Sequence, residues 1–106
     1  MDADFIPVAQ SQAVRLSRIT QVEVDNQSIL LTRLTDELCA FNALCPHQLG
    51  NLSRGFIYRE EIECPVHGWR FNLRTGKSVY PQEAGLCLRR YPVTEENGLI
   101  KIKFSR

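Results

Sequence analysis

Two short segments of the chain combine residue types that bind transition metals: Cys45-Pro46-His47 and Cys64-Pro65-Val66-His67. Each places a thiolate ligand close to an imidazole ligand, and sixteen residues separate the two segments. The chain has two histidines, and both fall in these segments. Two cysteines and two histidines arriving in two loops predict a four-ligand metal site built from Cys45, His47, Cys64 and His67.

The pattern C-x-H-x16-C-x2-H-G-W resembles the ligand motif of Rieske proteins. In that family two Cys hold one iron of a [2Fe–2S] cluster and two His hold the other. The resemblance implies one cluster per chain, with Cys45 and Cys64 on one iron and His47 and His67 on the other. A single zinc ion is the alternative, because such mixed loops can also converge on one metal ion.

Two features of the segments favour the cluster over zinc. Structural zinc sites mostly pair like ligands, whereas two equivalent loops can bring both thiolates to one end of a [2Fe–2S] rhomb and both imidazoles to the other. Cluster sulfurs also need backbone N–H donors. Gly50 and Gly68 would let backbone approach closely, and Pro46 and Pro65 stiffen the loops.

Composition indicates one ordinary globular domain over residues 1–106, with 43% hydrophobic and 24% charged residues. A net charge of +1 and the absence of a Lys/Arg run longer than Arg89-Arg90 give no support for nucleic-acid binding. No apolar run is long enough for a membrane helix, and the acidic N-terminus does not resemble a signal peptide. We therefore expect a cytoplasmic protein with reduced thiols, in which Cys39 and Cys87 are small buried residues.

The hydrophobic pattern predicts an all-β fold of short strands with tight turns. Asp25-Asn26 and Asn97-Gly98 are expected to form hairpin turns, and Pro7 suits an edge strand. Residues 11–16 fit either one helical turn or a loop. The expected strands cover 5–9, 18–24, 28–34, 38–41, 56–58, 61–63, 69–71, 77–80, 87–93 and 99–104.

These strands divide into two β-rich ends and a middle that carries the chemistry. The Rieske resemblance implies an antiparallel sandwich or barrel base, formed by 1–41 and 86–106, with an inserted cluster-binding subdomain over roughly 42–85. The resemblance also implies that cluster surroundings and a docking rim are formed by residues beside the ligands: Gln48, Leu49, Gly50, Gly68, Trp69 and Pro81. For Trp69, packing beneath the loop is the competing interpretation.

Differences from one branch of the family indicate which branch this chain resembles. Respiratory-complex Rieske proteins have an extra Cys in each ligand loop and hydroxyl donors after the second loop, where this chain has Trp69 and Phe71. Loss of hydroxyl donors disfavours the reduced cluster, so we expect a potential toward the negative end of the roughly −150 to +300 mV Rieske range. The resemblance points to the soluble bacterial branch.

The function implied by this resemblance is one-electron transfer and not catalysis. A flavin-dependent ferredoxin reductase would supply the electron, and a terminal oxygenase would receive it in a transient complex with a monomeric carrier. The chain ends at Arg106 without further histidines for a catalytic iron site. Two alternatives are the small Rieske subunit of a nitrite reductase-like enzyme and a zinc-stabilised interaction module.

Overall fold

Antiparallel β-structure dominates the computed structural model, which describes residues 5–46, 50–65, 68–82 and 85–104. The all-β prediction is confirmed, and the 3₁₀ turns η2 (Ser11–Ala13) and η3 (Leu52–Arg54) lie between strands. The strands are β1 (Phe5–Gln10), β2 (Thr20–Val24), β3 (Gln27–Arg33), β4 (Leu38–Asn42), β5 (Phe56–Tyr58), β6 (Glu61–Glu63), β7 (Arg70–Asn72), β8 (Ser78–Tyr80), β9 (Arg90–Tyr91), β10 (Val93–Glu96) and β11 (Leu99–Lys103).

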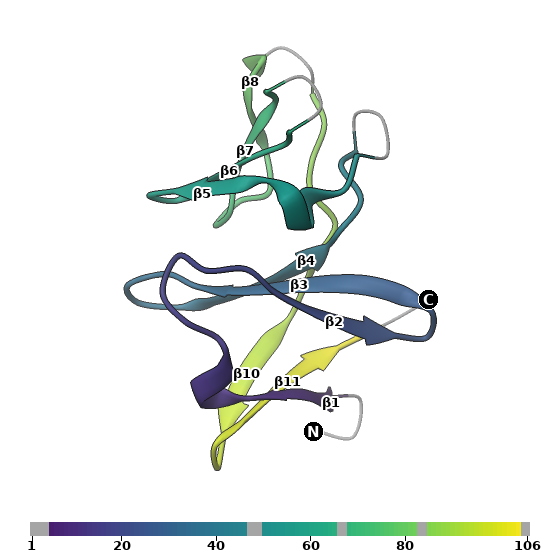
Figure 1. The fold of residues 1–106 in the computed structure, drawn as a ribbon, viewed down its shortest axis with the longest axis vertical. Helices are drawn as coiled ribbons and strands as arrows, with labels where there is room; N and C mark the ends of the chain where they lie inside the picture. The colour runs from purple at the N-terminus through teal and green to yellow at the C-terminus, as the bar shows by residue number, and fades with distance from the viewer. Residues whose placement is uncertain (1–4, 47–49, 66–67, 83–84, 105–106) are drawn as a thin grey trace.

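Two of the sheets form the lower part of the molecule in Figure 1. One has the order β1-β11-β10 and the other β2-β3-β4-β9. Alternation along β11 turns Ile100 and Ile102 inward, where they are fully buried with Ile29 and Leu31 of β3. We call these two sheets and their shared core the base.

The turns of the base follow the local chemistry expected from sequence. Asp25 and Asn26 between β2 and β3 have φ of 51° and 65°, and Asn97 and Gly98 between β10 and β11 have φ of 54° and 80°. These residue types tolerate left-handed backbone. β1, which contains Pro7, lies at the edge of its sheet as expected.

One expected strand, 87–93, is divided in the structure. β9 pairs with β4, whereas β10 pairs with β11 in the other sheet. Pro92 lies between them and has no N–H to continue a ladder. The chain therefore passes from one sheet of the base to the other at this proline.

The third sheet, β5-β6-β7-β8, lies above the base in Figure 1. Its strands have three residues each, and the cross-strand row Ile57, Ile62 and Phe71 faces inward. Ile62 and Phe71 are fully buried and belong to the same apolar core as Leu30 and Phe41 of the base. We call this unit the upper sheet; its core is shared with the base.

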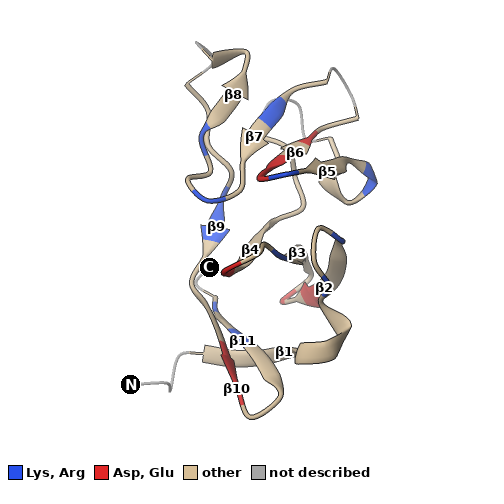
Figure 2. Ribbon diagram, turned by 90° about the vertical axis from the view of Figure 1, so that its left-hand side faces the viewer, with Lys and Arg blue, Asp and Glu red and all other residues tan. Residues whose placement is uncertain are grey.

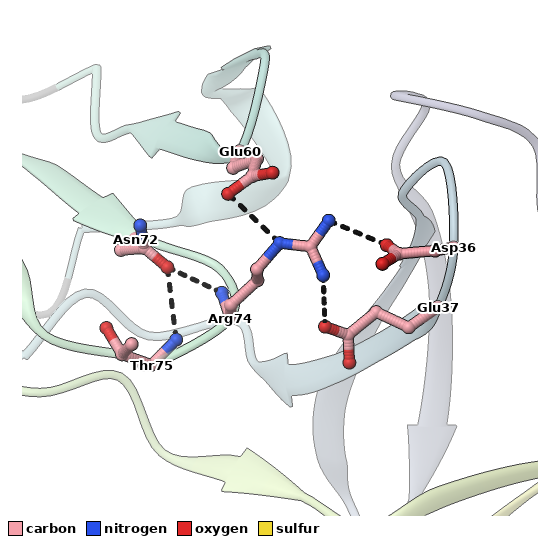
Figure 3. Close-up of polar contacts among 6 residues, drawn as sticks. All are labelled: Asp36, Glu37, Glu60, Asn72, Arg74 and Thr75. Carbon is pink, nitrogen blue, oxygen red and sulfur yellow. Dashed lines mark hydrogen bonds and ion pairs between the residues drawn. The ribbon is translucent and has the colours of Figure 1, made fainter.

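A cluster of ion pairs also joins the upper sheet to the base (Figure 3). Arg74, in the turn between β7 and β8, lies 2.6 Å from a carboxylate oxygen of Asp36 and 2.7 Å from one of Glu37, both before β4. Its Nε lies 3.0 Å from Glu60 in the turn between β5 and β6. One guanidinium thus holds three acidic side chains from both parts of the molecule.

Candidate metal centre

The first ligand loop leaves the base at β4 and is closed by backbone pairing. Leu44 and Asn51 form an antiparallel bridge, and the N–H of Cys45 donates to the carbonyl of Gly50 at 2.7 Å. Beyond the bridge, the N–H of Leu52 donates to the carbonyl of Ala43. The chain therefore leaves and re-enters the core at one point, with Cys45 at the stem of the loop.

The second ligand loop is the tip of the β6–β7 hairpin. Glu63 pairs with Arg70, and the N–H of Cys64 donates to the carbonyl of Trp69 at 2.7 Å. Gly68 has φ of 69° and donates its N–H to the carbonyl of Cys64 at 3.1 Å. A left-handed backbone at this point favours glycine, so Gly68 is required by the turn of the loop.

The two loops share one construction. In each, the residue before the cysteine pairs with a residue seven positions later, and the cysteine N–H donates to a carbonyl five positions later. Cys45 and Cys64 are both almost completely buried, and both are part of the apolar core shared by the base and the upper sheet. The structure thus places two thiols in equivalent positions, which suits the thiolate half of the expected ligand set.

A close backbone approach brings the stems of the two loops together. Gly55 follows η3 after the first loop, and a Cβ on it would lie 2.2 Å from the carbonyl oxygen of Glu63, directly before Cys64. Its N–H donates to the carbonyl of Leu52, which is fully buried. Only glycine fits this contact, since any side chain would overlap the β6 backbone.

Several predicted site residues lie outside the described residues: His47, Gln48, Leu49 and His67. In the part of the chain that the structure describes, no three His, Cys, Asp or Glu side chains converge as a metal site. The imidazole half of the ligand set therefore stays a prediction.

The remaining predicted site residues have clear positions. Trp69 is half-buried and packs against the shared core, in line with the packing interpretation, while its carbonyl closes the second loop. Gly50 is buried and closes the first loop, and Pro81 follows β8. In Figure 2, a basic segment of β7 lies beside an acidic one of β6, where Arg70 is 3.6 Å from Glu61.

The two further cysteines differ from each other. Cys39 is buried as expected, and burial raises the pKa of its thiol. The expectation of a buried Cys87 is wrong: Leu88 faces the core, which turns the side chain of Cys87 outward on this extended segment. Cys87 lines a surface cavity of about 250 Å³ together with Cys45 and Pro46.

Sequence reasoning missed one polar residue at this site. Asn42 ends β4 three residues before Cys45, is buried, and accepts a hydrogen bond from the N–H of Leu44. An asparagine two residues before a loop amide is the local signal that could have identified this contact.

Comparison with known proteins agrees with this geometry. The family model "Rieske [2Fe-2S] domain" matches residues 4–92. The ferredoxin component of the naphthalene 1,2-dioxygenase/salicylate 5-hydroxylase systems of a Ralstonia species is 31% identical over 97% of this chain and 98% of its own length. The ferredoxin of carbazole 1,9a-dioxygenase from Nocardioides aromaticivorans IC177 has a TM-score of 0.80 and 30% identity, with 92% of this chain and 95% of that chain covered.

A further solved structure, a complex of reduced oxygenase and oxidised ferredoxin in carbazole 1,9a-dioxygenase, has a TM-score of 0.82 and 25% identity over 93% of this chain and 92% of the matched chain. The chain belongs to the Rieske [2Fe–2S] family. Within that family it is of the ferredoxin type: an electron carrier with a [2Fe–2S] cluster and not a catalytic subunit. The zinc alternative is not supported. No described helix is long and apolar enough to cross a membrane.

Proposed function

We propose that Cys45 and Cys64 bind one iron of the cluster and that His47 and His67 bind the other. The observation that carries this assignment is the shared construction of the loops, which gives the two cysteines equivalent buried positions at the two stems. Bound there, the cluster accepts and releases one electron. The protein's own residues fix the loops and exclude water from the thiolates.

The partners proposed for this chain are a flavin-dependent ferredoxin reductase and a terminal oxygenase. The solved neighbour in which a ferredoxin is bound to an oxygenase supports the second partner. We propose that the carrier is a monomer that docks transiently through the rim around the loop tips, Gln48, Leu49, Trp69 and Pro81, since interfaces of electron-transfer complexes are small. The thiols of Cys39, Cys64 and Cys87 form no disulfide in the described part of the chain, which suits the cytoplasm.

We also propose residues 42–85 as the cluster-binding subdomain. Both loops, the upper sheet and the Arg74 turn fall within these limits. Phe71 is fully buried in the core beneath the loops and cannot donate a hydrogen bond to a cluster sulfur. The potential should therefore lie toward the negative end of the family range.

Electron paramagnetic resonance (EPR) of the reduced protein, combined with a redox titration, tests this proposal. The purified wild-type protein should show a Rieske spectrum, and His67→Ala and Cys64→Ser should lose it. An unchanged spectrum in His67→Ala would contradict the ligand assignment. A midpoint potential above about +100 mV, against the roughly −150 to +300 mV range of the family, would contradict the low-potential assignment alone.

A further inference from the structure

Asn42 is buried at the point where the base meets the first ligand loop, and both polar atoms of its side-chain amide are hydrogen-bonded. Its Nδ2 donates to the hydroxyl oxygen of Tyr91 at 3.1 Å and to Oε1 of Gln27 at 3.2 Å. Its Oδ1 accepts the N–H of Leu44 at 2.9 Å. One amide therefore links two strands of the base to the residue that precedes Cys45.

Packing and a backbone hydrogen bond hold Tyr91 and Asn42 in place. Tyr91 is buried in the base core, and its ring stacks on Phe104 with centroids 5.6 Å apart. The backbone N–H of Asn42 donates to the carbonyl of Arg89 at 2.8 Å. A buried amide whose nitrogen and oxygen are both hydrogen-bonded has one favoured orientation, because leaving its partners unpaired is costly.

We propose that Asn42 is a positioning residue, which holds Cys45 in place for the cluster by linking the N–H of Leu44 to Tyr91. This inference rests on the proposed role of Cys45 as a ligand. The 64–69 loop has a different support, since the paired strands β6 and β7 lead directly into it. The first loop begins instead at the Leu44–Asn51 bridge, which lies outside the named strands, so we expect the side-chain hydrogen bond of Asn42 to contribute more to its support.

Asn72 offers a matched control. Its Oδ1 accepts the N–H groups of Arg74 and Thr75 at 2.8 and 3.1 Å, which is the same kind of turn contact, in the β7–β8 turn (Figure 3). Removing this side chain also removes hydrogen bonds from a turn, but the turn does not lead into a ligand loop. A purely structural role for Asn42 would therefore make Asn42→Ala and Asn72→Ala behave alike.

The experiment compares cluster-loaded wild-type protein, Asn42→Ala and Asn72→Ala. Three quantities are measured on each: the rate of cluster loss from the visible absorbance, the unfolding midpoint from circular dichroism, and the EPR spectrum with the midpoint potential. We expect Asn42→Ala to lose its cluster at least about tenfold faster than Asn72→Ala. The free-energy cost of leaving buried groups unpaired corresponds to a tenfold ratio or more. The EPR g-values of Asn42→Ala should also move, while those of Asn72→Ala stay at the wild-type values.

Two further variants test the anchor even if Asn42→Ala does not fold. Asn42→Asp keeps an acceptor for Leu44, and its second oxygen can accept from the hydroxyl of Tyr91 and from the amide of Gln27. It should keep its cluster with a loss rate within roughly threefold of wild type, because a carboxylate that accepts several hydrogen bonds is well satisfied. Its potential should fall, because added negative charge disfavours the reduced cluster. Tyr91→Phe removes one acceptor and should accelerate cluster loss less than Asn42→Ala.

The outcomes separate this inference from the proposed function. Equal cluster loss, g-values and potential in Asn42→Ala and Asn72→Ala would overturn the positioning role while leaving the ligand assignment standing. Asn42→Asp losing its cluster about tenfold faster than wild type, or more, would also overturn it. A wild-type protein without a Rieske spectrum would overturn both.

Discussion

The base and the upper sheet reach stability by different means. Strands β2, β3, β4 and β11 have five to seven residues, and the base has a core of its own. The upper sheet has strands of three residues, and its buried row packs against Leu30 and Phe41 of the base. The buried row of the upper sheet is covered by the base, so the upper sheet depends on the base. The base has a second core and does not depend equally on the upper sheet.

This difference places both ligand loops in or beside the less independent part of the molecule. Proteins open locally where buried contacts are few, and ligand sites are often drawn from such regions. We therefore expect damage to the shared core to release the cluster before the base unfolds. Damage to the base core should instead lower the stability of the whole chain at once.

Core truncations should give the largest effects. Phe71→Ala, in the shared core, and Ile102→Ala, in the base core, each remove a fully buried side chain, and such truncations cost about 2–5 kcal/mol. Hydrogen exchange measured by mass spectrometry should show Phe71→Ala losing protection in β5–β8 while β3 and β11 keep theirs. Ile102→Ala should lose hydrogen-exchange protection in all three sheets. Equal loss in all three sheets of Phe71→Ala would contradict the comparison.

Gly55→Ala should give the next largest effect. Its Cβ would lie 2.2 Å from the carbonyl oxygen of Glu63, so the β6 backbone or η3 must move. Overpacking of this kind costs about 1–3 kcal/mol, and here it would spread the stems of the two loops apart. We expect faster cluster loss together with a lower midpoint in urea unfolding.

Gly98→Ala is the control for this substitution. Gly98 has a positive φ but nothing within 4 Å of its added Cβ, and it lies in a hairpin of the base. Gly98→Ala should lower the free energy of unfolding by about 1–2 kcal/mol through backbone strain. Its cluster loss should be no faster than this loss of stability explains. If both variants lose the cluster in step with unfolding, the contact at Gly55 does not position the loops.

The sequence predicted most of the base because its signals are local. Hairpin turns at Asp25-Asn26 and Asn97-Gly98 carry their own chemistry, and alternation along 99–104 places Ile100 and Ile102 correctly. The sequence also proposes the candidate metal ligands as a set, since the cysteines and histidines are few and closely spaced.

Long-range packing accounts for what the sequence did not predict. Cys87 points outward because the phase of its segment is set by Leu88 against the core and not by local alternation. Two partners of Asn42, Gln27 and Tyr91, are 15 and 49 residues away in the chain, and Arg74 contacts acidic residues from two separate turns. No local pattern encodes such pairings.

Arg74→Gln tests the polar connection between the upper sheet and the base. The substitution leaves Asp36, Glu37 and Glu60 without their shared guanidinium, so the upper sheet should lose more exchange protection than the base. The effect should be modest, because solvent and salt screen such pairs, and it should shrink in high salt. Arg70→Gln removes the 3.6 Å ion pair with Glu61 within the upper sheet; it is the control and should change protection less. An equal change in both variants would mean that Arg74 does not join the two parts.

The smallest predicted effect is the loss of stability when acid weakens the ion pair inside the base. A hydrogen bond from Arg33 on β3 lowers the pKa of Glu95 on β10 from 4.5 to about 2. Because the folded pKa lies below the ordinary value, the ion pair contributes fully above pH 4.5 and its contribution is lost as the pH falls toward 2. The stability difference between wild type and Glu95→Gln, from urea unfolding, should be constant above about pH 5 and shrink below pH 4.5, a window set by that same shift. Glu96→Gln, whose carboxylate lies 3.5 Å from Lys101, controls for cluster loss in acid, which is common to all three proteins.

The base should keep its exchange protection through this titration while the upper sheet loses its own first, since Arg74 also lowers the pKa of Asp36 and protonation there removes a bond between the two parts. Loss of protection in the base before the upper sheet would reverse the order of stability drawn from the two cores.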